Sequence, residues 1–502
     1  MKFVITILIA LAFLNGSAQT ASILANDNLD RLIWVNSFDI NDSKFHSVFR
    51  SYNNLILRID TVNNDISASG PMTMRPILSL GGEVRSYRGE QSINSQALAG
   101  VAVNKQINKK FNITGAIYGG LVDGNPERGV LPVTDDVYPG IGRYVNEDGN
   151  TDLLLDGLFA LNYSPSDIFE FELGRGKHFW GDGYRSLFLS DNPSAYPYLE
   201  LQTKVWHINY RNLFSWHQGM LDVRDSDSSF ENKFSTTHML SWNISPRVNI
   251  QLFESIIWQS EDSLSSRGFD VNYLNPIIFY RPVEFASGSA DNAILGLGCS
   301  FKVYPSYLIY GQLAIDEFLL EEFRARDGWW GNKFGAQLGI KGFDAFKVEG
   351  LYLQAEFNLV RPFTYSHGSP VQNYAHLNEA LAHPLGSNFY EAALIGVYDW
   401  KGFEFRNQLT YTLKGNDEGG MNLGGDIFRS YIGPERVYGN FIGQGSRTEF
   451  YENSVYISQV FHPRSDSRAM IGYHVRSDAS FNQGLEHFFS IMIRSNFSDV
   501  FR

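Results

Sequence analysis

The densest cluster of polar and aromatic side chains in this sequence lies between residues 174 and 198. It begins Gly174-Arg-Gly-Lys-His-Phe-Trp-Gly-Asp-Gly-Tyr-Arg-Ser-Leu-Phe-Leu-Ser190 and ends Tyr196-Pro-Tyr198. Aromatic ring faces can stack on the C–H surfaces of a sugar, and planar polar groups can hydrogen-bond its hydroxyls. The glycines do not form a phosphate-binding loop, because no Gly-x-x-x-x-Gly-Lys-Ser/Thr sequence occurs here and no helical pattern follows. The residue types therefore suit carbohydrate.

The same cluster also has a purely structural interpretation. Arg175, Lys177, Asp182 and Arg185 would form an ion-paired network that fixes the loop inside a lumen. The two interpretations are compatible, and the sequence leaves both open.

Two further segments combine arginine with aromatic residues, Arg324-Ala-Arg-Asp-Gly-Trp-Trp330 and Arg361-Pro-Phe-Thr-Tyr-Ser-His367. Both lie between regions of strand-like pattern, where binding residues are commonly placed. The residues that we predict to bind polysaccharide are Trp180, Asp182, Tyr184, Arg185, Tyr196, Trp329 and Trp330.

Catalytic and metal chemistry find weaker support. The adjacent carboxylates Glu321 and Glu322 suggest a glycosidase, which places two acids about the scissile bond, but adjacent acids in a loop are usually solvated. No Gly-x-Ser-x-Gly sequence is present, and His367, His376 and His383 share one loop without zinc-site spacing. We expect no enzymatic activity, no metal and no cofactor.

The elements that would position these loops are strands with one apolar and one polar face. In Leu351–Leu359 leucine, alanine and phenylalanine alternate with tyrosine, glutamine, glutamate and asparagine. Side chains of a strand alternate between its faces, so one face is apolar and the other polar. The pattern returns in Phe403–Lys414, Arg468–Arg476 and Leu485–Phe497. Strands of about ten residues, apolar outside and polar inside, are typical of a barrel that crosses a membrane.

Counting this pattern from residue 74 onward predicts eighteen strands. The predicted ranges are 74–84, 97–106, 111–121, 153–163, 167–175, 199–206, 209–217, 236–245, 247–259, 292–303, 305–317, 333–341, 347–360, 388–399, 402–413, 450–461, 467–477 and 484–497. The least distinct boundary lies near His207, where one long run must be cut in two.

Short turns alternate with long loops along this series. Outer-membrane barrels place short turns in the periplasm and long loops outside, and an even strand number puts both termini in the periplasm. A tandem of soluble β-sandwiches is the alternative, but it would predict neither the loop alternation nor an amphipathic final strand. The predicted fold is an all-β, antiparallel, up-and-down transmembrane barrel.

Residues 1–19 have the features of a signal peptide, with Lys2 before an apolar run and small residues at the expected cleavage site. Residues 20–70 would form a partly helical periplasmic segment, because apolar residues recur at helical spacing within 26–59. Residues 71–502 would form the barrel.

Composition narrows the classes of function. Aromatic residues make up 15% of the chain and glycine 46 of its 502 residues, which suits interfacial rings and tight turns. The net charge of −13 argues against nucleic-acid binding. The single cysteine, Cys299, allows no disulfide framework.

Several of these segments resemble the Wzi family of capsule-assembly outer-membrane proteins, in the branch found in gliding and gut bacteria of the Bacteroidetes type. The resemblance spans most of the chain after about residue 70 and is carried by Gly174–Asp191, by Tyr273-Leu-Asn-Pro276 with Phe279–Glu284, and by Arg361–His367. It implies a barrel that holds capsular or exopolysaccharide at the cell surface as a lectin. A gliding-motility surface protein is similar to this branch, which implies adhesion or gliding motility as the setting.

The expected function is therefore polysaccharide binding by the long loops of a monomeric barrel that also contacts outer-membrane lipid and lipopolysaccharide. One alternative is a porin-like passive channel, because barrels of this size can enclose an aqueous lumen. The side chains expected to line it are Tyr352, Glu356, Arg406, Lys414, Arg468, Arg476 and Arg494. The other alternative is a structural component of gliding or secretion machinery.

Overall fold

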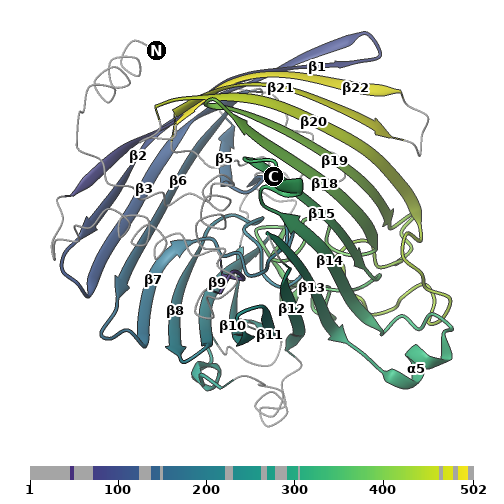
Figure 1. The fold of residues 1–502 in the computed structure, drawn as a ribbon. Helices are drawn as coiled ribbons and strands as arrows, with labels where there is room; N and C mark the ends of the chain where they lie inside the picture. Colours follow the sequence, from purple (N-terminus) through teal and green to yellow (C-terminus); the bar gives the residue numbers. More distant parts are fainter. Residues whose placement is uncertain are drawn as a thin grey trace.

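The computed structural model describes residues 46–49, 72–123, 137–146, 151–220, 230–261, 268–277, 291–303, 306–462, 467–478 and 484–495. These residues form a large antiparallel sheet that closes on itself, and a separate two-stranded sheet of β16 (Ala375–His376) and β17 (Glu379–Ala380) (Figure 1). The large sheet has twenty strands, of which β4 (Val137–Tyr138) and β5 (Gly142–Asn146) are short: β5 pairs with β4 on one side and with the end of β6 on the other. The other eighteen strands make the wall of the barrel.

The strands of the wall, in order, are β1 (Thr73–Tyr87), β2 (Glu90–Gln106), β3 (Phe111–Asp123), β6 (Thr151–Tyr163), β7 (Phe169–Gly176), β8 (Tyr196–Val205), β9 (Ile208–Met220), β10 (Phe230–Ser245), β11 (Val248–Gln259), β12 (Asn292–Val303), β13 (Tyr307–Glu317), β14 (Lys333–Gly342), β15 (Leu351–Val360), β18 (Phe389–Trp400), β19 (Phe403–Asn416), β20 (Ser446–His462), β21 (Ser467–Asp478) and β22 (Leu485–Ser495). Each pairs with the next, and β22 returns to β1 with Ser495 opposite Leu78. A closed sheet leaves no unpaired edge.

The predicted fold and the predicted strands are confirmed. The uncertain boundary is also correct, because β8 ends at Val205 and β9 begins at Ile208. On β15, Gln354, Glu356 and Asn358 are buried inside the barrel, while the intervening Phe357 is exposed on the outer face.

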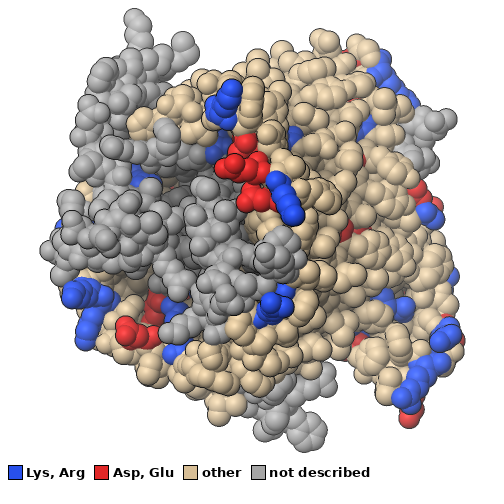
Figure 2. All heavy atoms as spheres, viewed as in Figure 1, with Lys and Arg blue, Asp and Glu red and all other residues tan. Residues whose placement is uncertain are grey.

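Apolar side chains dominate the outer face. Most of the surface described in Figure 2 is uncharged, and Lys, Arg, Asp and Glu gather in a few small groups. Exposed outward-facing residues include Leu155, Leu173, Leu338, Leu394 and Ile491. No helix among the described residues is long and apolar enough to span a bilayer.

Part of the lumen is an apolar core and not a polar channel lining. Inward-facing Leu213, Met239 and Phe253 of the wall pack with Phe188 and Tyr374 from two long loops. Phe188 stacks on Phe253 with ring centroids 4.8 Å apart. The alternation of apolar and polar faces therefore describes only the part of the wall that these loops do not cover.

The wall formed by β19–β22 and β1 carries charged side chains inside. Glu486 lies 2.9 Å from Arg85 and also pairs with Arg476, and Arg468 lies 3.5 Å from Glu404. The two pairs of Glu486 link neighbouring strands, and the Arg468–Glu404 pair links β21 to β19 across β20.

A short N-terminal piece also lies in the lumen. The Val48 carbonyl accepts a hydrogen bond of 2.8 Å from the Gly181 amide, and the Phe49 ring meets the Trp180 ring edge-on at 5.8 Å. The predicted signal peptide and all but residues 46–49 of the predicted helical segment lie outside the described residues.

The connection from β11 to β12 folds against the outside of the wall. We call its described residues 268–277 the strap; they include the 3-10 turn Val271–Leu274. Tyr273 is 1% exposed, and its ring lies 4.7 Å from that of Trp258, an outward-facing residue of β11. The strap is thus packed onto the barrel and does not project from it.

Polar side chains on the outer wall hold the strap by its backbone. The Tyr273 carbonyl accepts from the Thr236 hydroxyl at 3.2 Å, and the Pro276 carbonyl accepts from the Tyr210 hydroxyl at 2.7 Å. Asn212 donates to the same carbonyl at 3.3 Å. Irregular backbone on an outer wall needs such partners, because an unpaired carbonyl in an apolar medium is costly.

Candidate functional site

The loop between β7 and β8, residues 177–195, enters the lumen and folds back on itself. The Trp180 amide donates to the Leu189 carbonyl at 2.9 Å, which closes a turn with residues 181–188 at its tip. Both ends of the loop are fixed by wall strands, so the tip is directed toward the opposite wall.

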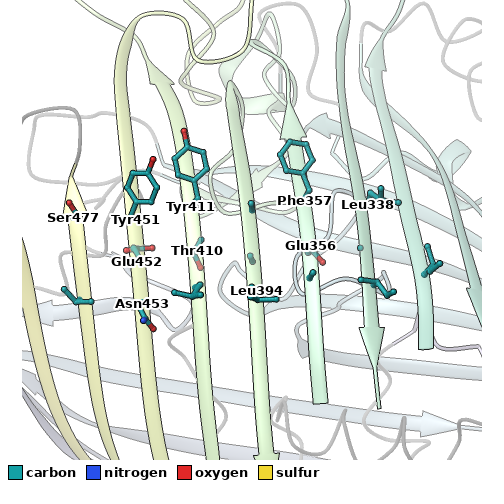
Figure 3. A pocket seen from close by; sticks show the side chains of 18 of the residues that line it. Leu338, Glu356, Phe357, Leu394, Thr410, Tyr411, Tyr451, Glu452, Asn453 and Ser477 are labelled. Atoms are coloured by element: carbon teal, nitrogen blue, oxygen red, sulfur yellow. The ribbon is translucent and has the colours of Figure 1, made fainter. Parts of the chain in front are cut away.

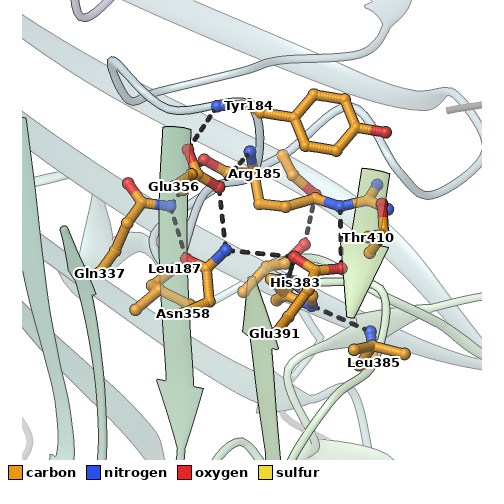
Figure 4. Close-up of polar contacts among 12 residues, drawn as sticks. Tyr184, Arg185, Leu187, Gln337, Glu356, Asn358, His383, Leu385, Glu391 and Thr410 are labelled. Carbon is orange, nitrogen blue, oxygen red and sulfur yellow. Dashed lines mark hydrogen bonds and ion pairs between the residues drawn. The ribbon is translucent and has the colours of Figure 1, made fainter. Parts of the chain in front are cut away.

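Glu356 of β15 anchors this tip (Figure 4). Its carboxylate accepts the amides of Tyr184 at 2.6 Å and Arg185 at 3.0 Å, and the hydroxyl of Tyr310 at 2.7 Å. A Cβ at Gly183 would lie 2.6 Å from the same carboxylate, so only glycine allows the approach. Hydrogen bonds to a charged acceptor are stronger than neutral ones, which makes Glu356 the main attachment of the loop.

Arg185 extends the attachment to the next strand. Its guanidinium lies 3.7 Å from Glu391 of β18 and 4.6 Å from the centroid of the Tyr184 ring. Burial lowers the pKa of Arg185, but nearby Tyr184 and the carboxylates of Glu391 and Glu356 outweigh it, so the net shift is upward. Asn358 donates to both carboxylates, and Figure 4 shows these residues as one network.

A second loop, residues 361–388, packs on the first. The hydroxyl of Tyr365 donates to the Leu187 carbonyl and that of Tyr374 to the Phe188 carbonyl, each at 2.8 Å. His383 lies 2.9 Å from Glu391, and burial lowers the pKa of His383 despite that carboxylate. We call the two loops together the plug.

The structure places five of the seven predicted binding residues in or beside the plug. Trp180 is 1% exposed and Tyr196 0%, and Asp182 and Tyr184 are also buried. Arg185 is half-buried. Their contacts are with the protein itself, so a sugar could reach the Trp180 and Tyr196 rings only if the loop moved. Their role in binding stays a prediction.

The structural interpretation of the same loop finds direct support. Arg175 forms an ion pair of 2.5 Å with Asp156 of β6, and Lys177 donates to the Asp191 carbonyl at 3.2 Å. Asp182 accepts from Gln251 of β11 at 3.0 Å. The predicted residues do fix the loop inside the lumen, but mostly by bonding to the wall and not to one another.

Trp329 and Trp330 lie elsewhere, at the end of the barrel that carries the long loops. They follow α5 (Leu320–Ala325), and their ring centroids are 6.2 Å apart. Trp330 also contacts Tyr431 at 5.4 Å, and Arg361 donates to the Trp329 carbonyl at 3.1 Å. Three long loops therefore meet at the two tryptophans.

Tyr431 and Tyr438 were missed by the sequence analysis. The Trp330 amide donates to the Val437 carbonyl at 2.9 Å, which brings the loop 417–445 beside the tryptophans, and the Tyr438 ring is 48% exposed. The only signal in the sequence was the length of that loop. We call Trp329, Trp330, Tyr431 and Tyr438 the crown.

The weaker candidates do not converge on a site. Glu321 and Glu322 are exposed or half-exposed on α5, and His376 accepts from the Gln218 amide at 3.1 Å, apart from the His383–Glu391 pair. Among the described residues, no group of three His, Cys, Asp or Glu side chains could hold a metal ion.

Acid is expected to loosen the plug through His376. Burial, with the positive charges of Lys233 and Arg175, lowers the pKa of His376 from 6.5 to about 3. The folded state then binds fewer protons than the unfolded loop, so the stabilisation is complete above pH 6.5 and is lost toward pH 3, by about 1.4 kcal/mol per pH unit. Hydrogen exchange of residues 374–385, corrected for its intrinsic pH dependence, should accelerate between pH 7 and 4. A His376→Gln variant should show a flatter profile; equal profiles would contradict the assignment.

A closed antiparallel barrel of eighteen strands is the fold of outer-membrane β-barrels, and the chain has this fold. No family model matches the sequence, and no curated protein is detectably related to it. Among solved structures it is similar to Wzi of Escherichia coli, described as an outer-membrane protein involved in group 1 capsule assembly and a carbohydrate-binding β-barrel. That match has a TM-score of 0.55 and 12% identity, and it covers 95% of this chain and 100% of Wzi.

The barrel is thus Wzi-like in fold. It is also similar to OprD of Pseudomonas aeruginosa, with a TM-score of 0.46 and 8% identity over 86% of this chain and 93% of the other.

Proposed function

We propose that this barrel binds capsular or exopolysaccharide at the cell surface through the crown, as a lectin and not as an enzyme. The long loops then face outward and the short turns face the periplasm. The observation that carries the proposal is the contact among the Trp329, Trp330 and Tyr431 rings where three long loops converge, with the exposed Tyr438 in the same loop as Tyr431. Partly exposed rings of this kind offer faces to sugar rings, whereas the rings of the plug are buried.

The plug supports binding over passive transport. Its aromatic residues pack with inward-facing residues of the wall, and Lys414 donates to the carbonyls of Leu385, Ser387 and Gly425 at 2.9–3.0 Å. Glu356 and Lys414, which a channel would use as lining, instead hold loops. The observation that favours the porin-like alternative is the charged inner wall of β19–β22, where Arg468 and Arg476 are paired with carboxylates.

Replacement of Trp329 and Trp330 by alanine is expected to weaken binding of purified capsule or exopolysaccharide at least tenfold, or about 1.4 kcal/mol. The matched control is Trp206→Ala/Trp400→Ala, which removes two exposed tryptophans at the short-turn end.

A deletion strain should release polysaccharide that the parent retains. Equal binding by both double variants would refute the crown, and a large steady conductance of the native protein in planar bilayers would favour the channel.

A further inference from the structure

The outer wall holds a groove that the proposed function does not use. Its volume is about 740 Å³, within the range of about 300–1,000 Å³ that is common for small-molecule sites. The groove is centred on β14, β15, β18, β19 and β20 and extends to one or two residues each of β13, β21 and β22 at its margins (Figure 3). We propose that it is a lipid site that takes an acyl chain of lipopolysaccharide.

The strand register puts the lining side chains outside the barrel. Phe357 lies opposite Ala392, Ala392 opposite Tyr411, and Tyr411 opposite Tyr451, so these residues form one row across four strands. In Figure 3 the rings of Phe357, Tyr411 and Tyr451 stand side by side and point the same way. The next row toward the short turns contains Ala355, Leu394 and Leu409.

The hollow follows from the sizes of these side chains. Ala392 lies between Phe357 and Tyr411 in the first row, and Ala355 lies between Ile340 and Leu394 in the second, so each small side chain is flanked by large ones. Directly behind Ala355 and Phe357, Glu356 is bonded to the plug. The floor therefore belongs to a stretch of wall that is held from the inside, which keeps the hollow fixed.

The lining and its surroundings identify the occupant. Leu338 at one end is 63% exposed on the apolar outer face, so the groove is continuous with the surface that meets membrane lipid. Lipid tails are as apolar as the wall, so the hydrophobic effect does not favour one acyl chain over another. A particular lipid must be selected by the shape of the groove and by polar contacts with the lipid headgroup.

Those polar contacts lie on the long-loop side of the groove. Arg447 of β20 contacts the Tyr411 hydroxyl and pairs with Glu449, and its side chain is 55% exposed. An exposed arginine beside phenol hydroxyls suits the phosphorylated, amide-bearing head of a glycolipid. With the long loops outward, this end lies in the outer leaflet. The choice of lipopolysaccharide over phospholipid thus rests on the orientation of the barrel in the proposed function. The existence of the groove does not depend on that orientation.

The test measures lipid that co-purifies with the full-length protein. The barrel would be extracted from outer membranes in mild detergent, and its fatty acids would be quantified per mole of protein, with 3-hydroxy acids reporting lipopolysaccharide and unhydroxylated acids reporting phospholipid. Ala355→Leu/Ala392→Leu should fill the floor and lower the 3-hydroxy acids at least twofold. Ala99→Leu, at an outward position of β2, is the control and should retain the wild-type amount.

A second variant, Arg447→Ser, leaves the floor intact and should also lower the 3-hydroxy acids. Equal lipid in the wild type, both variants and the control would overturn the site. A loss confined to unhydroxylated acids would overturn lipopolysaccharide as its source. Polysaccharide binding by the same samples reports on the crown separately, so failure of the groove and failure of the proposed function are distinguishable.

Discussion

Replacement of Glu356 by alanine is expected to release the tip of the 177–195 loop and to give the barrel an ion conductance well above that of the native protein. The carboxylate accepts from the Tyr184 and Arg185 amides and the Tyr310 hydroxyl, all of which would lose a buried partner. Each orphaned donor costs about 1–3 kcal/mol, so the sum is comparable with the free energy that holds a loop.

Planar-bilayer recordings and proteolysis of intact barrels would measure this release. Glu356→Gln is the matched control, because it keeps one acceptor oxygen and the side-chain shape and should fall between wild type and alanine. If Glu356→Ala conducts and resists protease as the wild type does, the carboxylate is not the main attachment of the loop.

The wall of this barrel could be predicted from its sequence because strand alternation is a local property. In β15 every second residue from Gln354 to Asn358 is polar and faces inward, and a window of nine residues suffices to show it. The turn between Val205 and Ile208 was the least distinct boundary, placed near His207 only because one long strand-like run had to be cut in two.

The contacts that hold the plug and the strap could not be predicted, because they join residues far apart in the chain; for the first loop of the plug, only its place inside the lumen was among the interpretations of the sequence. Tyr184 and Glu356 are 172 residues apart, and neither has neighbours in sequence that reveal the other. Inward-facing Met239 and Phe253 break the expected polar face, and only the position of Phe188 explains them. The residues of the 174–198 cluster that were predicted to bind sugar build a folded core in the lumen, and this explains their aromatic and polar types. Residue types alone do not distinguish such a core from a binding surface.

The crown could be predicted only in part, for the same reason. Trp329 and Trp330 stood out as a pair, but Tyr431 contacts Trp330 from a loop about a hundred residues later in the chain. A loop has no regular sequence pattern, so its position depends on the residues that it contacts. The loop 417–445 is held beside the tryptophans by the hydrogen bond from the Trp330 amide to the Val437 carbonyl.

The strap covers polar side chains on the outer face of the wall, where a membrane barrel would otherwise expose them to lipid. Four polar residues face outward and are nonetheless buried: Asn212, Thr236 and His238 are 0% exposed and Glu254 is 1% exposed. His238 lies midway along β10, four residues from outward-facing Phe234 and four from Trp242. Without the strap these polar groups would face lipid at mid-depth, where a polar group without a hydrogen-bond partner is costly.

Replacement of Tyr273 by alanine is therefore expected to impair assembly of the barrel more than loss of one buried ring would in a soluble protein. The variant loses the packing on Trp258 and the hydrogen bond of 2.6 Å to Asp291, and a buried aromatic replaced by alanine costs about 3–5 kcal/mol before any exposure of Asn212 to lipid is added. Tyr273→Phe keeps the ring and loses only the hydroxyl, so it should fold nearly as well as the wild type. Folding into vesicles, followed by the heat-dependent gel shift of intact barrels, measures the difference. If the alanine variant folds as efficiently as Tyr273→Phe, the polar wall tolerates lipid and the strap is not what shields it.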